Sequence, residues 1–390
     1  MTPAARIAAA IEVLDAVASG RPAEQALTNW ARRSRFAGSG DRAAIRDHVF
    51  EALRCRRSFA ALGGDAGGRG LMIGALRAAG REPAAVFTGE RFAPKPLSAE
   101  EQAAGRGWEA LSELERLDCP DWIAPALESS LGADFAAVMS LMRARAPVFL
   151  RVNLLKADID TARAFLAREN VKTELHPLAA TALLVTEGSK RIRTTQAFQD
   201  GLIERQDQAS QAVVEAIGAT HGRGSVLDYC AGGGGKSLAL AALGWRTVVA
   251  HDADPRRMND LPGRAARAGA DIRVATSAEL AGTAPFDLVV CDVPCSGSGA
   301  WRRQPEAKWT LTPEALSHLC AVQAGILDTA SRLVAPGGRL AYITCSLLAA
   351  ENADQVGAFL QRTPGWRLIE QHRWTPLDGG DGFANALIGR

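Results

Sequence analysis

Two cysteines are the residues of this chain best suited to covalent chemistry. Cys295 lies in the segment DVPCSG, and Cys345 lies in the segment TCS. They follow short apolar runs, Phe286–Val290 and Arg339–Ile343 respectively, that are typical of buried strands. Because the carboxyl ends of parallel strands meet at one edge of a sheet, we expect the two thiols to lie together beside a cofactor site.

Methyl transfer to carbon 5 of a pyrimidine is one of the few reactions that need such a pair of thiols. Carbon 5 is a poor nucleophile, but a thiolate that adds to carbon 6 turns the ring into an enamine. A base must then remove the carbon 5 proton before the thiolate leaves, so the reaction needs both a nucleophile and a general base. Only a thiolate is competent, and we expect Lys236, Arg302 and Arg303 to favour it. We expect Asp292 to hydrogen-bond the protonated ring nitrogen.

The other five cysteines have the ordinary features of small buried residues. The seven cysteines are scattered, without CxxC pairs or histidines at zinc spacing. This predicts free thiols in a reducing cytoplasm, and no metal site. A disulfide between Cys295 and Cys345 is not expected in that compartment. The other five are Cys55, Cys119, Cys230, Cys291 and Cys320.

A glycine-rich turn upstream predicts a Rossmann-type cofactor site. The strand end at Val226-Leu227 is followed by four glycines, Gly232–Gly235, and then by the helical segment Leu238–Leu243. Asp252 ends the next strand, where a carboxylate would accept hydrogen bonds from ribose hydroxyls. Asp228 precedes the turn, where it would accept one from an amino group.

Two other interpretations of this glycine-rich turn are less consistent with the sequence. A phosphate-binding P-loop needs a glycine five residues before Gly235, and position 230 is a cysteine. A nicotinamide cofactor stays open, but it explains neither Cys295 nor Cys345. The candidate cofactor-binding residues are Asp228, Cys230, Ala231, Gly232, Gly233, Gly234, Gly235, Lys236, Asp252, Arg257, Asp292 and Pro294.

Three regions are predicted along the chain. Residues 1–145 have helical periodicity, for example over Ala4–Val17. Within Asn29–Arg57, eight arginines stand against three acids. These arginines form either a solvated helix surface or a patch that contacts phosphates, and both interpretations stay open. The segments Gly63–Gly70 and Arg81–Gly107 are predicted to be loops or loose connections.

After Pro147 the pattern changes to α/β. Residues 146–220 form a predicted small α/β subdomain, with strands at Val148–Asn153 and Ala182–Val185 around a helix at Ile159–Glu169. From residue 221 to 390, continuous apolar strands such as Thr247–Ala250 alternate with helices. This predicts a mostly parallel sheet with helices on both faces, preceded by the small subdomain and an all-helical N-terminal domain.

Composition narrows the class of protein. The chain has 390 residues, of which 47% are hydrophobic and 23% charged, as in ordinary globular proteins. No stretch approaches the ~20 apolar residues of a membrane helix, and no secretory signal is recognisable. The net charge of +2 does not by itself indicate a nucleic-acid partner. We expect a cytoplasmic monomer that contacts no membrane.

Several segments resemble one known family, the RsmB/Fmu/Sun RNA 5-methylcytosine methyltransferases. Phe286–Gly299 with its continuation Arg302–Trp309 is similar to motif IV of that family, and Pro336–Ser346, followed by Glu351-Asn352, is similar to motif VI. The resemblance covers roughly residues 120–390 and is most specific in these motifs. Further similar segments are Gln206–Ser210, Phe149–Asn153, Gly380–Phe383 and, more faintly, Asp41–Arg54, which resembles a NusB-like RNA-binding domain.

The resemblance implies specific roles. Cys345 would be the nucleophile, Cys295 the base that releases the product, and S-adenosyl-L-methionine the methyl donor. Asp292 and Lys236 would complete the catalytic set, and the substrate would be RNA, with ribosomal RNA favoured. The residues expected to contact RNA are Arg302, Arg303, Lys308 and Arg151.

Two positions depart from the family pattern. Gly233 stands where the family has proline, and Thr276-Ser277-Ala278 stands where an aspartate near the adenine is expected. Two other functions were weighed. A non-catalytic RNA-binding or ribosome assembly factor would not need both thiols, and a methyltransferase for DNA or a small molecule would not need the arginine-rich arm.

Overall fold

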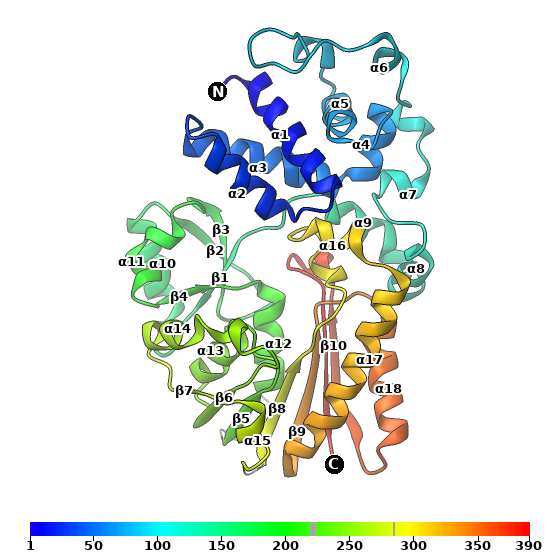
Figure 1. Ribbon diagram of the computed structural model, residues 1–390. Helices are drawn as coiled ribbons and strands as arrows, with labels where there is room; N and C mark the ends of the chain where they lie inside the picture. Colours follow the sequence, from blue (N-terminus) through cyan, green and yellow to red (C-terminus); the bar gives the residue numbers. More distant parts are fainter. Residues whose placement is uncertain (219–223, 284) are drawn as a thin grey trace. The chain divides into compact units, whose positions relative to one another are not determined.

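The computed structural model describes residues 1–218, 224–283 and 285–390, which divide into two compact units. The helical unit comprises Met1–Arg145 together with Trp301–Thr310, and the α/β unit comprises Ala146–Ala300 together with Leu311–Arg390. Figure 1 labels the elements of both. The roles assigned to the three predicted regions stay predictions.

The helical unit begins with an amphipathic helix, as predicted. Thr2 caps its first turn by accepting a hydrogen bond from the backbone N–H of Ala5. Its buried side chains pack with those of the third and fifth helices, including Ile45, Val49 and Ile73. The α-helices of the unit are α1 (Pro3–Ala18), α2 (Ala23–Arg33), α3 (Ser39–Arg54), α4 (Arg56–Gly63), α5 (Gly68–Ala78), α6 (Ala99–Ala103), α7 (Glu113–Arg116), α8 (Ala124–Leu131), α9 (Phe135–Met142) and α16 (Pro305–Thr310).

The glycine-rich segment 63–70, predicted to be a loop or an interhelical linker, does join two helices, α4 and α5, and these helices pack closely. A Cβ atom at Gly74 would lie 1.9 Å from the backbone oxygen of Phe59, and one at Gly63 would lie 1.9 Å from that of Gly70. Only glycine permits backbones to approach so closely. The run is therefore a packing feature of α4 and α5.

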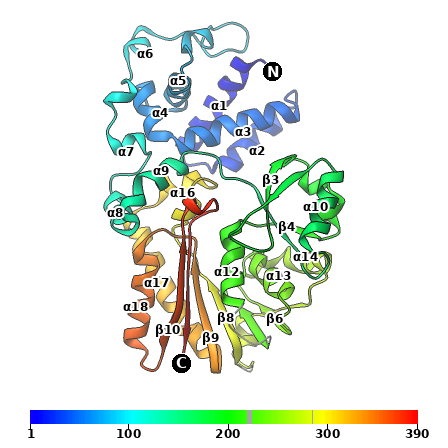
Figure 2. The same ribbon diagram turned by 180° about the vertical axis from the view of Figure 1, so that it is seen from behind.

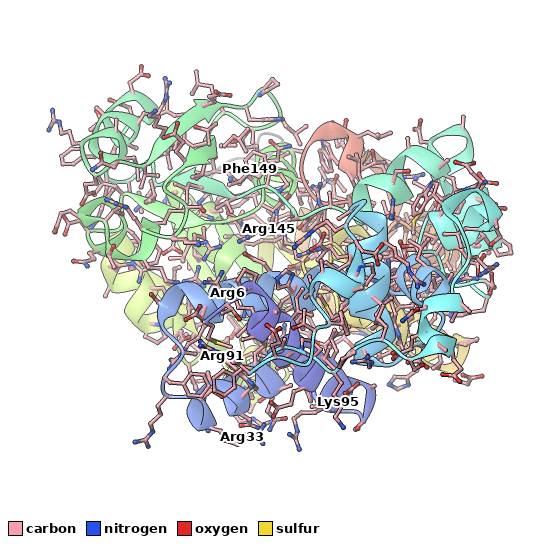
Figure 3. The ribbon with its side chains drawn as sticks, turned by 90° about the horizontal axis from the view of Figure 1, so that it is seen from above. Arg6, Arg33, Arg91, Lys95, Arg145 and Phe149 are labelled. Atoms are coloured by element: carbon pink, nitrogen blue, oxygen red, sulfur yellow. The ribbon has the colours of Figure 1, made fainter. Side chains whose placement is uncertain are left out.

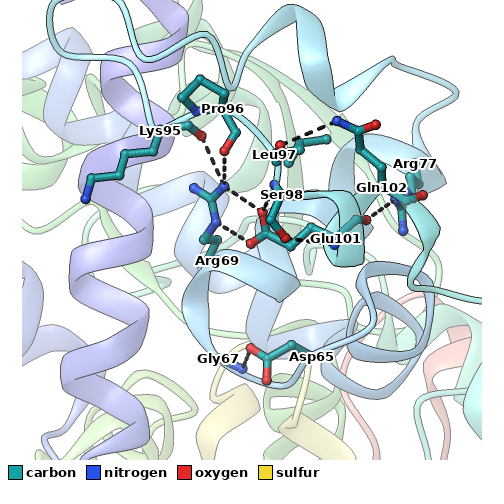
Figure 4. Close-up of polar contacts among 10 residues, drawn as sticks. All are labelled: Asp65, Gly67, Arg69, Arg77, Lys95, Pro96, Leu97, Ser98, Glu101 and Gln102. Atoms are coloured by element: carbon teal, nitrogen blue, oxygen red, sulfur yellow. Dashed lines mark hydrogen bonds and ion pairs between the residues drawn. The ribbon is translucent and has the colours of Figure 1, made fainter.

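The stretch 81–107, predicted to be loosely connected, is held by two arginines of α5 (Figure 4). Arg69 forms a paired contact with Glu101, at 2.5 and 2.8 Å, and also donates to the backbone oxygens of Lys95 and Pro96. Arg77 donates to the backbone oxygens of residues 62, 101 and 104. Charge-assisted bonds to several carbonyls fix an otherwise irregular segment.

Arg69→Met should destabilise the protein by about 1–3 kcal/mol, because a half-buried carboxylate and two backbone oxygens lose their donor. The pair is less than one third exposed on both sides, at 29% and 28%. The matched control is Arg33→Met, whose pair with Glu12 is 67% and 54% exposed and should contribute under about 1 kcal/mol. Urea unfolding of both variants would measure the difference, and equal losses would contradict this account.

The α/β unit contains a small four-stranded antiparallel sheet with strand order β2-β3-β1-β4 (Figure 2). Its strands are β1 (Phe149–Val152), β2 (Lys172–Leu175), β3 (Ala182–Glu187) and β4 (Ile203–Arg205). Helices α10 (Ile159–Arg168) and α11 (Gln196–Gln199) pack against it through Leu166 and Ala197. The predicted strands at 148–153 and 182–185 and the helix between them are confirmed.

The larger sheet has seven strands in the order β10-β11-β9-β8-β5-β6-β7. The pairs among β5 to β9 are parallel, and β11 joins antiparallel to β9 and β10. The mostly parallel sheet confirms the predicted fold class. The strands are β5 (Ser225–Asp228), β6 (Thr247–Ala250), β7 (Ile272–Val274), β8 (Phe286–Asp292), β9 (Val334–Thr344), β10 (Arg367–Trp374) and β11 (Phe383–Gly389).

Helices cover both faces of this sheet (Figure 1). Alternate residues of each strand face opposite ways, so Leu227 and Val289 enter one core while Val226 and Leu288 enter the other. The first core is closed by α17 (Pro313–Ala330) and α18 (Ala353–Arg362). The second face is covered by α12 (Gln208–Gly218), α13 (Gly235–Ala242) and α14 (Leu261–Ala268). The short α15 (Ser277–Leu280) follows β7.

Candidate active site

The two thiols predicted to meet at the sheet edge are in contact. Strands β8 and β9 are parallel neighbours, with Asp292 paired to Ile343, and each runs directly into a cysteine loop. The sulfur atoms of Cys295 and Cys345 lie 3.4 Å apart and form a hydrogen bond, and both residues are half-buried free thiols. The expectation that strand ends bring them together is confirmed.

The two loops are tied to each other through their backbones. The N–H of Val293 donates to the oxygen of Ile343 at 3.0 Å, and the N–H of Gly299 donates to the oxygen of Cys345 at 2.9 Å. The Ser298 hydroxyl accepts from the N–H of Leu347 at 2.8 Å. Hydrogen bonds between the two cysteine loops fix the distance between the side chains that these loops carry.

The Cys295 thiol has a raised pKa and therefore tends to keep its proton. Its hydrogen bond with Cys345 is the largest cause that raises the pKa of Cys295 well above its ordinary value, followed by burial and by nearby negative charge, including that of Glu351. Two adjacent thiols cannot both ionise without repulsion, so one proton stays with the pair. At neutral pH Cys295 is therefore the thiol member of the pair.

Lys236 and Asp292 form a close ion pair at the same edge. The Lys236 ammonium donates to Asp292 Oδ2 at 2.6 Å and lies 5.2 Å from the centroid of the Phe383 ring. Lys236 comes from the start of α13 and Asp292 from the end of β8, so the pair joins the glycine turn to the strand that leads to Cys295. Arg302 and Arg303, also expected to supply positive charge, belong to the helical unit.

The glycine turn has the backbone shape that a ligand cradle needs. Gly232 and Gly234 have φ values of 53° and 75°, a region that favours glycine. The N–H of Gly232 donates to Asp252 Oδ2 at 2.9 Å, and Arg257 contacts the same oxygen at 3.1 Å. Arg264 donates to the backbone oxygen of Gly233. The Asp252 carboxylate therefore lies beside the glycine turn, where two donors, the Gly232 N–H and Arg257, hold it.

Asp228 is a buried carboxyl group with one unused oxygen. It is fully buried, and its Oδ2 accepts from the Ser237 hydroxyl at 2.6 Å. Its Oδ1 is buried without a hydrogen-bond partner among the described residues. Burial raises the pKa of Asp228 to about 6, although the Ser237 bond opposes the shift. A buried acceptor with no partner indicates a group that a ligand would supply.

The remaining turn residues have mixed exposure. Cys230 and Ala231 are half-buried, and Pro294 is exposed. Burial raises the pKa of Cys230 above its ordinary range, so this thiol is inert, as expected of a small buried residue. The N–H of Ala231 donates to the oxygen of His251 at 2.8 Å.

Three residues expected to contact RNA are buried in this structure, and their role toward RNA stays a prediction. Arg151 is 4% exposed and donates to the backbone oxygen of Gly235 at 2.8 Å and to Gln206. Lys308 is 1% exposed and donates to the backbone oxygen of Arg54 at 3.0 Å. Arg302 is 4% exposed. Arg151 and Lys308 thus each bind a backbone oxygen of the chain, and Arg303 is half-buried.

Many arginines within residues 29–57 have acidic partners that lie outside that segment. Arg33 pairs with Glu12, Arg46 with Glu24, and Arg57 with Asp121. The excess of positive charge in residues 29–57 is therefore partly neutralised by acids from other parts of the chain. Exposed basic side chains of this unit include those of Arg91 and Lys95 (Figure 3).

His251 was not among the residues singled out from the sequence, and Glu351 was named there only as part of a motif, without a role. The His251 ring stacks on Tyr229 at 4.7 Å, and its Nε2 lies 2.9 Å from the hydroxyl of Ser277, in the segment where an aspartate was expected. Glu351 is a buried carboxylate that touches both cysteine loops. The contacts of His251 are with residues more than 20 positions away, and those of Glu351 include Ser296 and Gln323, so local patterns did not reveal these contacts.

Two searches of the described residues found nothing. No group of three or more His, Cys, Asp or Glu side chains there could hold a metal ion. No helix among them is long and apolar enough to cross a membrane.

Two family models match the chain. Residues 217–384 match the model of the 16S rRNA methyltransferases RsmB/F, and residues 119–190 match the ferredoxin-like domain of RsmF/B-like methyltransferases. Together the two matches cover more than half of the chain.

Curated relatives carry one shared name. The ribosomal RNA small subunit methyltransferase B of Vibrio vulnificus is 30% identical over 287 residues, and that of Salmonella arizonae is 31% identical over 283 residues. Each alignment covers 69% of this chain and 66% of the relative, so the chain spans just under two thirds of their length.

Solved structures share the fold. The crystal structure of the protein PH0851 has a TM-score of 0.74 at 22% identity and covers 100% of this chain and 99% of its own. The NSun6 protein from Pyrococcus horikoshii, solved with SFG, has a TM-score of 0.60 at 17% identity, and covers 70% of this chain and 98% of its own.

Proposed function

We propose that this chain, which belongs to the RsmB/F methyltransferase family, methylates carbon 5 of a cytosine in ribosomal RNA with S-adenosylmethionine as donor. The observation that carries the proposal is the contact between the Cys295 and Cys345 sulfur atoms, 3.4 Å apart. Few reactions use two thiols at one point, and carbon 5 methylation needs both a nucleophile and a base.

In the proposed reaction, the Cys345 thiolate adds to carbon 6 of a cytosine that has been extruded from its stack. As the thiolate adds, the ring nitrogen takes a proton from water, which it returns when the thiolate leaves. The Asp292 carboxylate accepts a hydrogen bond from this N–H, and Lys236, 2.6 Å from the carboxylate, holds it in place. Carbon 5 becomes nucleophilic because the adduct is an enamine. After methyl transfer, Cys295 removes the carbon 5 proton, the double bond reforms, and the Cys345 thiolate leaves.

The residues of the glycine turn fit S-adenosylmethionine. When bound, this cofactor supplies an electrophilic methyl group. Asp252 would accept the ribose hydroxyls, and Asp228, whose Oδ1 is buried without a partner among the described residues, would accept the amino group. A Cβ at Gly232 would meet Arg257 at 3.1 Å and one at Gly234 would meet Leu261 at 2.2 Å, so neither position has room for a side chain.

Asp252→Ala should weaken binding of S-adenosylmethionine about tenfold or more, because hydrogen bonds to a charged acceptor contribute about 1.5–3 kcal/mol. The carboxylate also holds the N–H of Gly232 at 2.9 Å. Asp254→Ala is the matched control, since this exposed acid pairs only with nearby Arg256. Isothermal titration calorimetry would measure both affinities, and equal affinity in both variants would argue against a ribose contact at Asp252.

Cofactor affinity should rise with pH between about pH 5 and about pH 7. The folded protein holds the Asp228 proton up to about pH 6, whereas the unfolded chain releases it near 3.8. The folded state therefore binds more protons in this window, so the stability contributed by Asp228 falls as pH rises through it. Only the carboxylate accepts the cofactor amino group. Titrations at several pH values should show this slope in the wild type and not in Asp228→Asn; a retained slope would contradict the assignment.

The whole proposal is tested by incubating the protein with small-subunit ribosomal RNA and S-adenosylmethionine labelled in its methyl group. Nucleosides from the digested RNA are then separated and identified by mass spectrometry. The label is expected in 5-methylcytidine. Label in another nucleoside would contradict methylation of cytosine carbon 5. No label, although calorimetry shows bound donor, would contradict the proposal and favour an assembly factor.

A further inference from the structure

A single buried carboxylate bridges the two cysteine loops. Glu351 ends the short helix η8 (Ala349–Glu351) and is fully buried. Its Oε1 accepts from the backbone N–H of Ser296 at 2.8 Å and from the side-chain amide of Gln323 at 3.0 Å. Its Oε2 accepts from the hydroxyls of Ser296 and Ser346. Four donors on one carboxylate fix its position closely.

The two serines are the direct neighbours of the thiols. Ser296 follows Cys295 and Ser346 follows Cys345, so the carboxylate holds one loop against the other within one residue of each sulfur. The Ser298 hydroxyl lies 3.1 Å from that of Ser346 and strengthens the same link. A shift of Glu351 would therefore move both cysteines relative to each other.

The charge of Glu351 is not neutralised by its hydrogen-bond partners. All four of its donors are neutral groups. Its charge raises the pKa values of Cys295, Cys320 and the Tyr342 hydroxyl. In a buried setting an uncompensated negative charge opposes a second negative charge nearby.

We propose that Glu351 is a positioning residue: its carboxylate holds the Cys295 and Cys345 sulfurs in contact, and its charge keeps the proton on Cys295, so that Cys345 acts as nucleophile. This inference rests on the proposed function for its meaning in the reaction. Nothing in the family comparison assigns the residue a role.

The proposed order of proton movements balances. Before the reaction, Cys295 keeps its proton, and in the proposed first step the Cys345 thiol gives its proton to water as its sulfur bonds to carbon 6. Once the Cys345 sulfur is bonded to carbon 6, its negative charge is gone, and the hydrogen bond from Cys295 to it weakens. The Cys295 proton can then leave to water, and the resulting thiolate takes the proton of carbon 5.

The charge is tested by Glu351→Gln in the full chain without RNA or donor. The amide keeps the size of the side chain, and the serine hydroxyls can turn to accept hydrogen bonds from its NH₂ group. The hydrogen bonds between the two cysteine loops are therefore kept while the charge is lost. Iodoacetamide alkylation of each cysteine is followed by peptide mass spectrometry across pH. The midpoint for Cys295 should move down by about half a pH unit or more, while Asp354→Asn, an exposed acid three residues on, leaves it unchanged. An unchanged midpoint in Glu351→Gln overturns the electrostatic part.

The positioning role is tested by Ser346→Ala. This variant keeps the charge of Glu351 and removes the hydrogen bond from the Ser346 hydroxyl to Glu351. Diamide oxidises a pair of adjacent thiols to a disulfide, at a rate that reports how well the pair is held. Disulfide formation between Cys295 and Cys345 should slow severalfold in Ser346→Ala, and a wild-type rate overturns the positioning role. Ser346→Ala also tests the positioning role if thermal unfolding shows that Glu351→Gln does not fold.

These readouts need neither RNA nor methyl transfer. If the wild type fails to methylate RNA while Glu351→Gln still shifts the Cys295 midpoint, the proposed function fails and the electrostatic role of Glu351 stands. If the wild type methylates RNA and neither variant changes thiol reactivity, only the role of Glu351 fails.

Discussion

Replacing Cys345 with alanine should lower the rate of RNA methylation at least about a thousandfold, since losing the nucleophile removes the only route to an activated carbon 5. The Cys345 side chain is half-buried and packs on the sheet core, so alanine should be tolerated without unfolding. Binding of S-adenosylmethionine should be unchanged within about twofold, because the glycine turn is intact. Methyl incorporation and calorimetry on the same sample measure both.

The control is Cys320→Ser, which alters a half-buried thiol on α17 outside the pair and should retain the wild-type rate. A Cys345→Ala variant that still methylates at more than about a tenth of the wild-type rate would exclude Cys345 as nucleophile.

Replacing Cys295 with alanine should lower turnover about 10²–10⁴-fold, the usual contribution of a general base. Unlike Cys345→Ala, this variant should form the bond to carbon 6 and methylate once, but it cannot release the product. Protein and RNA should therefore migrate together on a denaturing gel. The double variant Cys295→Ala/Cys345→Ala should give no such band.

A band that persists in Cys345→Ala would reverse the roles of the two cysteines. A Cys295→Ala variant that turns over normally with no trapped complex would show that another group removes the proton.

The strands that lead to the cysteines could be predicted from sequence because each is a continuous apolar run. The runs 286–290 and 339–343 fall within β8 and β9, and 247–250 coincides with β6. Strand β10 was not predicted, because Arg367, Glu370 and His372 interrupt its apolar pattern. Most residues of this edge strand are exposed or half-buried, so its sequence need not be apolar.

The contact between the thiols could be expected from the rule that parallel strands end at one edge, but burial of charged residues could not. Arg151 and Lys308 were assigned to RNA because of their charge, yet each donates to a backbone oxygen far away in sequence. Glu351 has its partners at Ser296 and Gln323, 55 and 28 positions away. Such partners are set by tertiary structure, which local patterns do not contain.

The central claim is that the Cys345 sulfur bonds to the cytosine ring, and mapping that bond tests it most directly. The trapped complex of Cys295→Ala with RNA would be digested with nuclease and protease, and its peptides analysed by tandem mass spectrometry. The account predicts a nucleotide of methylated cytosine on the peptide Leu340–Arg362, attached at Cys345. A nucleotide on any other cysteine, or a trapped complex without a nucleotide on Cys345, would contradict it.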